Sequence, residues 1–180
     1  MRKKLLCCIL LSVAFFPSHA QPDFDFEQRD SIFFLKIGIP FPDFTLTNTS
    51  GDVFSEKDMK GKITVINFWF KSCIPCIAEL SALNKLFLKF KDHPDFLLLS
   101  FTTDSHEIAK EAINKFNILF DVYPTTKKEC DRLFCMGFPT SIIIDKLGTI
   151  LFHHVGGHTE KEKVAEYFEE LEDKIDNLLK

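Results

Sequence analysis

The clearest hydrophobic pattern lies in the middle of the chain, where an apolar run changes into a helical repeat. Residues 63–70, ITVINFWF, are almost continuously apolar, as in a strand that is covered on both faces. After Lys71-Ser72, apolar side chains recur at steps of three and four residues, which predicts a helix with one buried face. That face comprises Ile77, Leu80, Leu83, Leu86, Phe87 and Phe90. A buried strand therefore leads directly into an amphipathic helix.

The other apolar and polar positions predict two hairpins and a second buried strand. Residues 43–55 alternate between apolar and polar side chains on either side of a turn, and residues 140–145 and 149–155 flank another turn. Residues 95–102, DFLLLSFT, form the second nearly continuous apolar run. The chain therefore supplies two buried strands and two hairpins.

Helices are expected between and after these strands. Ser105 is a candidate cap for a helix that reaches Phe116, Thr126 opens a short helical stretch, and Thr159 precedes a last amphipathic helix. A helix between two parallel strands crosses right-handed, and a strand hairpin then adds antiparallel strands. The prediction is an α/β fold with an N-terminal β-hairpin and a central mixed β-sheet flanked by helices.

The first 20 residues have the pattern of a secretory signal peptide. Arg2, Lys3 and Lys4 precede an apolar run, and Ser18-His19-Ala20 is a small-x-small cleavage site. The run of about twelve apolar residues is shorter than the roughly 20 that span a bilayer, which disfavours an uncleaved anchor. We expect cleavage after Ala20, a periplasmic or otherwise exported protein, an N-terminal extension at residues 21–37 and one domain at residues 38–180.

Composition adds three constraints. Removal of residues 1–20 leaves 19 basic and 26 acidic residues, a formal net charge of −7, so nucleic acid is not an expected partner. Four of the six cysteines remain, as two close pairs, in a compartment where disulfides persist. The hydrophobic content of 46% is ample for a single core.

One cysteine pair, Cys73-Ile74-Pro75-Cys76, stands where the buried strand meets the helix. A sulfur at the start of a helix lies near unpaired backbone N–H groups and the positive end of the helix dipole, which favours the thiolate. Pro75 suits a first helical turn because its missing N–H loses no hydrogen bond there. The pair is predicted to carry out dithiol–disulfide exchange. A zinc site shared with Cys130 and Cys135 is the rival interpretation, although zinc knuckles lie in poorly hydrophobic loops.

Two longer motifs carry a family resemblance. NFWFKSCIPC at residues 67–76 and GFPTSIIID at residues 137–145 resemble the thioredoxin superfamily, and within it the exported TlpA/ResA-like thiol–disulfide oxidoreductases. GIPFPDFTL at residues 38–46 and KGK at residues 60–62 are further matches. The resemblance covers roughly residue 38 to the C-terminus and implies a thioredoxin-like fold.

The resemblance also implies roles for individual residues. Cys73 would be the exposed nucleophile and Cys76 the resolving thiol, with a cis-proline at residue 139 beside them. Glu79 matches an acidic residue proposed to relay protons for the cysteines, and the alternative is a solvated first-turn glutamate. The substrate groove would be lined by Ile74, Pro75, Phe138 and Pro139.

Two positions depart from the family pattern. Asn67 stands where thioredoxin has a buried aspartate, so a proton relay has to use Glu79 or water. Ser72 replaces the aromatic residue usually found before the first cysteine, which makes the rim of the groove smaller and more polar. The resemblance therefore implies no particular substrate.

The second cysteine pair, Cys130 and Cys135, lies outside the family pattern. On one continuous helix, Cα atoms five residues apart are separated by roughly 8 to 9 Å, whereas a disulfide needs less than about 7 Å. A bridge therefore requires the helix to end between them. A structural disulfide, two buried free thiols and an auxiliary redox pair are all open.

The predicted function is the reduction of protein disulfides through a mixed disulfide on Cys73, which Cys76 resolves. This function needs no cofactor or metal, and it implies protein disulfide or dithiol substrates and a membrane or periplasmic electron donor. The alternative is a copper-binding or metallochaperone module that uses Cys73, Cys76 and one histidine. His153 and His154 point to opposite faces of a strand and so cannot chelate together. A peroxiredoxin is disfavoured because no threonine stands three residues before Cys73.

Overall fold

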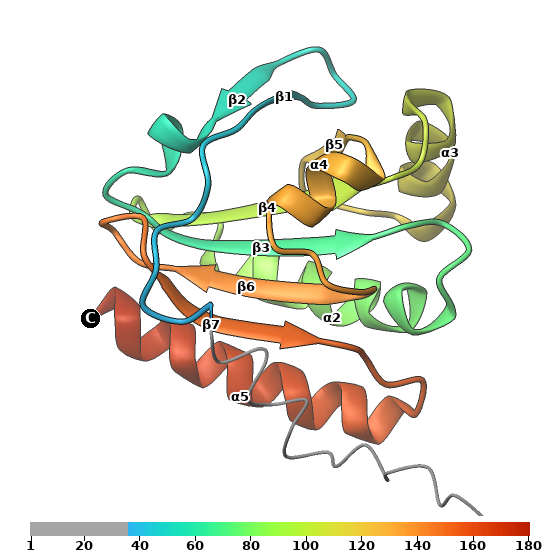
Figure 1. Ribbon diagram of the computed structural model, residues 1–180. Coiled ribbons are helices and arrows are strands. Elements are labelled where there is room, and N and C mark those ends of the chain that lie inside the picture. The colour runs from blue at the N-terminus through green and yellow to red at the C-terminus, as the bar shows by residue number, and fades with distance from the viewer. Residues whose placement is uncertain (1–35) are drawn as a thin grey trace, which may run out of the picture.

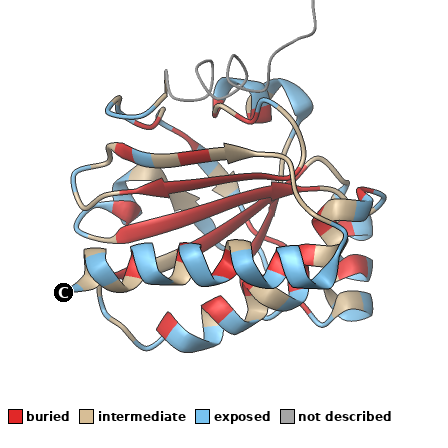
Figure 2. Ribbon diagram, turned by 90° about the horizontal axis from the view of Figure 1, so that it is seen from below, coloured by how far each residue is buried: buried red, intermediate tan, exposed pale blue. Residues whose placement is uncertain are grey.

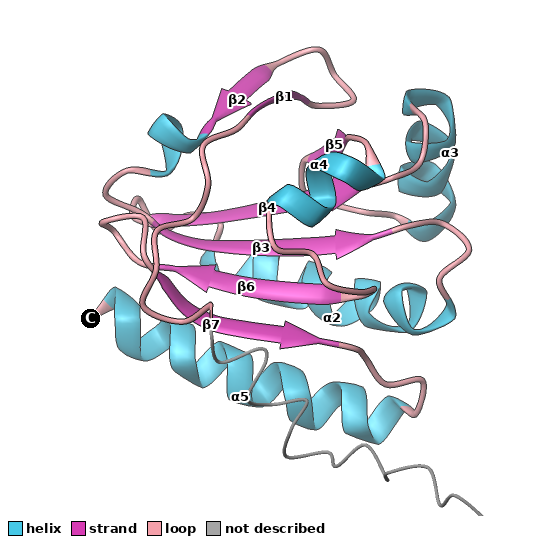
Figure 3. Ribbon diagram, viewed as in Figure 1, coloured by secondary structure: helices cyan, strands magenta, loops and turns pink. Residues whose placement is uncertain are grey.

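The computed structural model describes residues 36–180, so the predicted signal peptide and most of the N-terminal extension lie outside the described residues. The elements in chain order are β1 (Thr45–Thr47), β2 (Val53–Ser55), the 3-10 helix η1 (Glu56–Met59), β3 (Ile63–Trp69), α2 (Ile74–Phe90), β4 (Phe96–Thr102), α3 (His106–Phe116), β5 (Val122–Pro124), α4 (Lys127–Arg132), β6 (Thr140–Ile144), β7 (Ile150–Val155) and α5 (Lys161–Leu179) (Figures 1 and 3).

The centre of the fold is a five-stranded mixed sheet in the order β5-β4-β3-β6-β7. Strand β3 is parallel to β4 and antiparallel to β6, and all seven of its residues are buried. Strands β1 and β2 pair antiparallel as a separate two-stranded sheet. The predicted α/β fold with a central mixed sheet and an N-terminal hairpin is therefore confirmed.

The two faces of the sheet pack against different elements, because side chains alternate along each strand. Val65 and Trp69 of β3 join a hydrophobic cluster that includes buried residues of α2, α3 and α5. Ile66 and Phe68 join a second cluster, which includes residues of α4 and of the segment before the hairpin. Figure 2 shows the buried residues concentrated in the strands and the exposed ones on the outer faces of the helices. Helices therefore cover both faces.

Two local features differ from the sequence prediction. Strand β5 was not expected, because three residues that end in Pro124 give little strand signal; it pairs in parallel with β4 at the edge of the sheet, where proline is tolerated. Helix α5 begins after Glu160 rather than after a Thr159 cap. Between residues 36 and 180, no helix is both long enough and apolar enough to cross a membrane.

Candidate active site

The site begins in the turn that follows β3. The Trp69 indole Nε1–H donates to Ser100 Oγ on the neighbouring strand β4, at 2.7 Å. The Lys71 backbone N–H then donates to Asp104 Oδ2 at 2.6 Å, and the Cys73 N–H donates to the Phe70 carbonyl at 3.0 Å. These bonds fix the direction in which the chain leaves the sheet and enters α2.

Cys73 is the N-cap residue of α2. Its backbone is extended, with φ −80° and ψ 103°, and its Sγ accepts the Cys76 N–H at 3.3 Å. Pro75 lies in the first turn, where a proline N–H would have had no partner in the helix. The expectation that a backbone N–H is directed at the Cys73 sulfur is confirmed, and such a bond stabilises a thiolate.

Cys73 and Cys76 are joined in a disulfide with their Cα atoms 5.2 Å apart. The exposed fractions are 6% for Cys73 and 2% for Cys76, so the expectation of an exposed Cys73 is wrong for this oxidised form. Both cysteines belong to the apolar cluster that contains Trp69, and Phe138 packs against that cluster. The disulfide is therefore buried, whereas the neighbouring Ile74 is 74% exposed and presents an apolar side chain to solvent at this end of α2.

The Phe138–Pro139 peptide bond is cis, as the resemblance implies. The Phe138 ring meets the Phe70 ring edge to face, with the centroids 5.1 Å apart. The Pro139 carbonyl accepts the Gly156 N–H at 2.8 Å, which ties the start of β6 to the loop after β7. Pro139 itself is buried, whereas Phe138 and Pro75 are half-buried.

Glu79 lies three residues after Cys76 on α2 and is only 1% exposed, so the solvated alternative is wrong. The carboxyl accepts the His158 backbone N–H, and Oε1 has no hydrogen-bond partner between residues 36 and 180. Burial raises the pKa of Glu79 from its ordinary 4.5 to about 8, although the His158 bond opposes this rise. The side chain is therefore mainly protonated at neutral pH.

Gly157 brings Glu79 and Pro139 together. A Cβ atom on Gly157 would lie 2.4 Å from Glu79 Oε1 and 2.6 Å from Pro139 Cγ, so only a glycine fits without displacement of its neighbours. Sequence reasoning did not identify Gly157, His158 or Asp104 as site residues. Two features of the sequence could have pointed to these residues: the Gly156-Gly157 pair after the last strand, and the aspartate two residues after the end of β4.

Comparisons with known proteins agree with this geometry. A model of the AhpC/TSA family matches residues 37–153. The chain belongs to this family. The thiol-disulfide oxidoreductase ResA of Bacillus thuringiensis (strain Al Hakam) is 30% identical over 139 residues, which cover 76% of this chain and 79% of ResA. The thioredoxin-like protein YneN of Bacillus subtilis (strain 168) is 32% identical over 123 residues, 67% of this chain and 72% of YneN.

Solved structures give the same assignment. A Chlorobium tepidum structure, described as a DsbE-type thiol:disulfide interchange protein, superposes with a TM-score of 0.70 at 28% identity and covers 80% of this chain and 98% of its own. With the cysteine pair at the strand–helix junction, these relatives identify the chain as a thioredoxin-like thiol–disulfide oxidoreductase of the TlpA/ResA-like group.

A row of polar residues crosses the sheet of this oxidoreductase beneath α2 and α5. Ser100, Asn67, Ser141 and His154 are register partners on β4, β3, β6 and β7. Asn67 is 1% exposed, and its side-chain amide makes no hydrogen bond within the described part of the chain. The position that departs from the family pattern is therefore a neutral, buried polar group.

The other candidate metal ligands, the second cysteine pair and the two histidines, do not lie together at this site. Cys130 and Cys135 belong to the cluster on the opposite face of the sheet from Cys73 and Cys76, which separates the two pairs that a shared zinc site needs. His153 Nε2 lies 2.8 Å from the Phe134 carbonyl, whereas the His154 ring lies 4.9 Å from the Tyr167 ring. The two histidines therefore face opposite sides of β7, as expected. In residues 36–180, no three His, Cys, Asp or Glu side chains gather closely enough to hold a metal ion.

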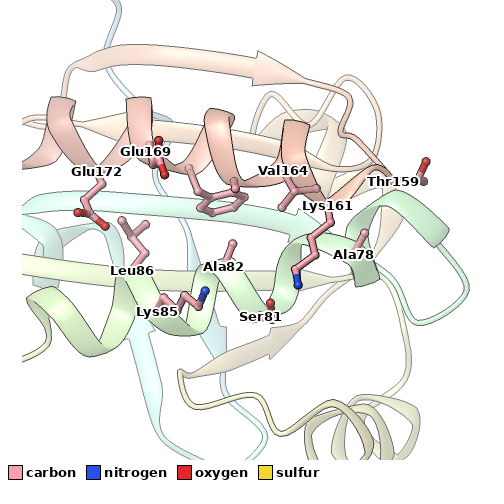
Figure 4. A pocket seen from close by; sticks show the side chains of 12 residues that line it. Ala78, Ser81, Ala82, Lys85, Leu86, Thr159, Lys161, Val164, Glu169 and Glu172 are labelled. Carbon is pink, nitrogen blue, oxygen red and sulfur yellow. The ribbon is translucent and has the colours of Figure 1, made fainter.

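A groove of about 520 Å³ lies between α2 and α5 (Figure 4). Small α2 side chains, among them Ala78 and Ala82, face Val164 and Lys161 of α5 across it. Neither cysteine of the disulfide nor Glu79 lines this groove. The groove therefore lies beside the redox site and not within it.

The first testable prediction concerns Glu79. The folded state keeps a proton that the unfolded state releases above pH 4.5, so the free energy of unfolding should fall as the pH rises from 4.5 to about 8. The expected loss is roughly 3 kcal/mol between pH 4.5 and pH 7, and Glu79→Gln should abolish it. Urea unfolding of the oxidised protein at several pH values measures both curves. Parallel curves for the two proteins would show that Glu79 titrates normally.

Proposed function

We propose that this oxidoreductase is exported and reduces protein disulfides through a mixed disulfide on Cys73. The observation that carries the proposal is the bond from the Cys76 N–H to Cys73 Sγ at the start of α2. A thiol placed in this way loses its proton more readily than a free cysteine, and the thiolate is the reactive species in exchange. Cys76 has no comparable N–H donor at its sulfur among the hydrogen bonds of residues 36–180.

The reaction begins with both cysteines reduced. Cys73 thiolate attacks one sulfur of a substrate disulfide, breaks that bond and releases one substrate thiol. Cys76 then loses its proton and attacks Cys73 Sγ, which breaks the mixed disulfide and releases the second substrate thiol. The substrate gains two electrons and two protons, and the enzyme is left with the Cys73–Cys76 disulfide that the structure contains. A dithiol electron donor then restores the reduced pair.

Glu79 is proposed to handle the Cys76 proton. A carboxyl with a pKa of about 8 is close in acidity to an ordinary thiol, so proton transfer between them costs little in either direction. Cys76 and Glu79 are three residues apart on α2, which places them on the same face of the helix, and both are buried. The carboxylate would accept the Cys76 proton before resolution and return one when the disulfide is reduced.

The substrate groove is proposed to lie between the start of α2 and the Phe138 segment. The exposed Ile74 offers an apolar contact, while Pro75 and the Phe138 ring form the half-buried floor beside it. Pro139 is buried beneath this surface and positions Phe138 rather than contacting solvent. An extended protein segment that carries the disulfide fits such a shallow apolar surface, because exposed apolar patches favour binding to other chains.

Replacement of Cys76 tests the mechanism. Cys76→Ser keeps the nucleophile but removes the resolving thiol, so substrate proteins should remain bound to Cys73 as adducts that dithiothreitol releases. Non-reducing gels and mass spectrometry after incubation with a periplasmic extract measure this. Cys73→Ser is the matched control and should capture nothing. Adducts on Cys130 or Cys135, or none at all, would contradict the proposal.

The reduction potential tests the direction of electron flow. The Ile74-Pro75 dipeptide lacks the histidine found between the cysteines of oxidising relatives. The reduction potential should therefore lie closer to the value of thioredoxin, roughly −270 mV, than to that of the oxidant DsbA, about −120 mV. Equilibration with glutathione buffers, read out by alkylation of Cys73, gives this value. A potential above about −180 mV would make the protein an oxidant instead.

Export is tested by the N-terminus of the mature protein. The full chain, expressed in a Gram-negative host, should appear in the periplasmic fraction with Gln21 as its first residue, because cleavage is expected after Ala20. Leu10→Arg places a charge in the apolar run and should keep the protein uncleaved in the cytoplasm. Unsubstituted protein that starts at Met1 in the cytoplasmic fraction would refute export.

A further inference from the structure

The second cysteine pair lies at the C-terminal end of α4, away from the proposed catalytic machinery. Cys130 is 0% and Cys135 is 1% exposed, and both are free thiols. They belong to the cluster that contains Phe68 and Phe101, on the sheet face opposite the Cys73–Cys76 disulfide. Nothing in the catalytic cycle uses these thiols.

The end of α4 brings the two cysteines together. Phe134 adopts the left-handed conformation, with φ 63°, and the Cys135 N–H donates to the Cys130 carbonyl at 2.9 Å. The Phe134 N–H donates to the Asp131 carbonyl at 3.2 Å. These two bonds form a Schellman motif, in which the side chains at the positions of Cys130 and Cys135 make contact. The helix therefore ends between the cysteines, which is the condition that a spacing of five residues requires.

The thiols interact with each other and with the next segment of the chain. The Cys130 thiol donates to Cys135, which lowers the pKa of Cys135 and raises the pKa of Cys130. Cys135 Sγ in turn donates to the Gly137 carbonyl at 3.2 Å, and Thr140 Oγ1 donates to the same oxygen at 2.7 Å. Cys135 is therefore the thiol of the two that loses its proton more readily, and it is tied to the residues on both sides of Phe138 and Pro139.

We propose that Cys130 and Cys135 are a second redox couple, which a small disulfide such as oxidised glutathione converts into an internal bridge. The bridge would join α4 to the segment that carries Phe138. Because Phe138 packs against the cluster that contains Cys73 and Cys76, the state of the second couple would set how freely this side of the proposed groove moves. The redox couple itself involves different cysteines from the proposed function, and only its effect on the groove rests on that proposal.

The exchange balances without another reactant. Cys135 thiolate attacks one glutathione sulfur, which breaks the glutathione disulfide, releases one glutathione thiolate and leaves a mixed disulfide. Cys130 loses its proton and attacks Cys135 Sγ, which breaks the mixed disulfide and releases the second glutathione. The two protons from the protein thiols go to the two glutathione thiolates. The protein loses two electrons, and oxidised glutathione gains them.

Access to the buried thiols requires a local opening of α4. This helix has six residues, and Cys130 is the buried one among them. A short helix held by so little apolar surface opens at a small free-energy cost compared with global unfolding. Oxidation of the second couple should therefore be slower than that of Cys73 and Cys76, and mild urea should accelerate it.

The test uses the Cys73→Ser/Cys76→Ser variant, in which the second couple reacts without help from the first. After incubation with oxidised glutathione, peptide mapping should show a Cys130–Cys135 link and the loss of both thiols. The same map on the unsubstituted protein gives the answer where the variant does not fold. Thiols that persist in folded protein but react once it is denatured, or glutathione adducts without a link, would overturn the proposal.

Amide hydrogen exchange tests the structural consequence. In the linked form, exchange across residues 127–138 should be slower than in the reduced form, while exchange in α5 should stay unchanged. A variant that also carries Cys130→Ala cannot form the link and should show no such slowing after the same treatment. Equal exchange in the linked and reduced forms would refute the tie between α4 and the Phe138 segment.

Discussion

The complete burial of β3 is the constraint on which the rest of the structure depends. Strand β3 is paired on both edges and covered on both faces, so the chain reaches the surface of the sheet only where β3 ends. The parallel register with β4 sets Trp69 opposite Thr102, so Asp104 follows at the same edge of the sheet and accepts the Lys71 N–H. The position of Cys73 at the start of α2 is thus determined by the strand and its neighbour rather than by the cysteine motif.

Some buried polar groups at the site lack hydrogen-bond partners within the described part of the chain. Buried polar atoms are usually hydrogen-bonded, yet both polar atoms of the Asn67 side chain and Oε1 of Glu79 make no such bond between residues 36 and 180. An aspartate in place of Asn67 would put a second carboxyl on the same face of the sheet, and two buried carboxyls disfavour each other's ionisation. Among residues 36–180, the asparagine therefore leaves Glu79 as the buried carboxyl that can exchange a proton on this side of β3.

Much of the fold could be predicted from the sequence because its strongest signals are local. The buried strand at residues 63–70, the helical stripe that begins at Ile77 and the two hairpins follow from periodicity alone, and the resemblance supplied the cis bond at Pro139. Strand β5 could not be predicted, since its three residues become a strand only by pairing with β4. The closeness of Gly157 to Glu79 likewise depends on how the loop after β7 returns to α2, which no local pattern encodes.

The two cysteine pairs show how the end of a helix governs thiol chemistry. Cys73 caps an N-terminus, so its sulfur faces a backbone N–H, which stabilises negative charge whatever the state of Cys76. Cys130 and Cys135 close a C-terminus, where the Cys135 sulfur donates to the Gly137 carbonyl, and the hydrogen bond with the Cys130 thiol is the largest cause that lowers the pKa of Cys135. The first thiolate is therefore available in every turnover. The Cys135 thiolate depends on the hydrogen bond from Cys130, which is lost once Cys130 reacts. This dependence suits a redox couple that changes state rarely.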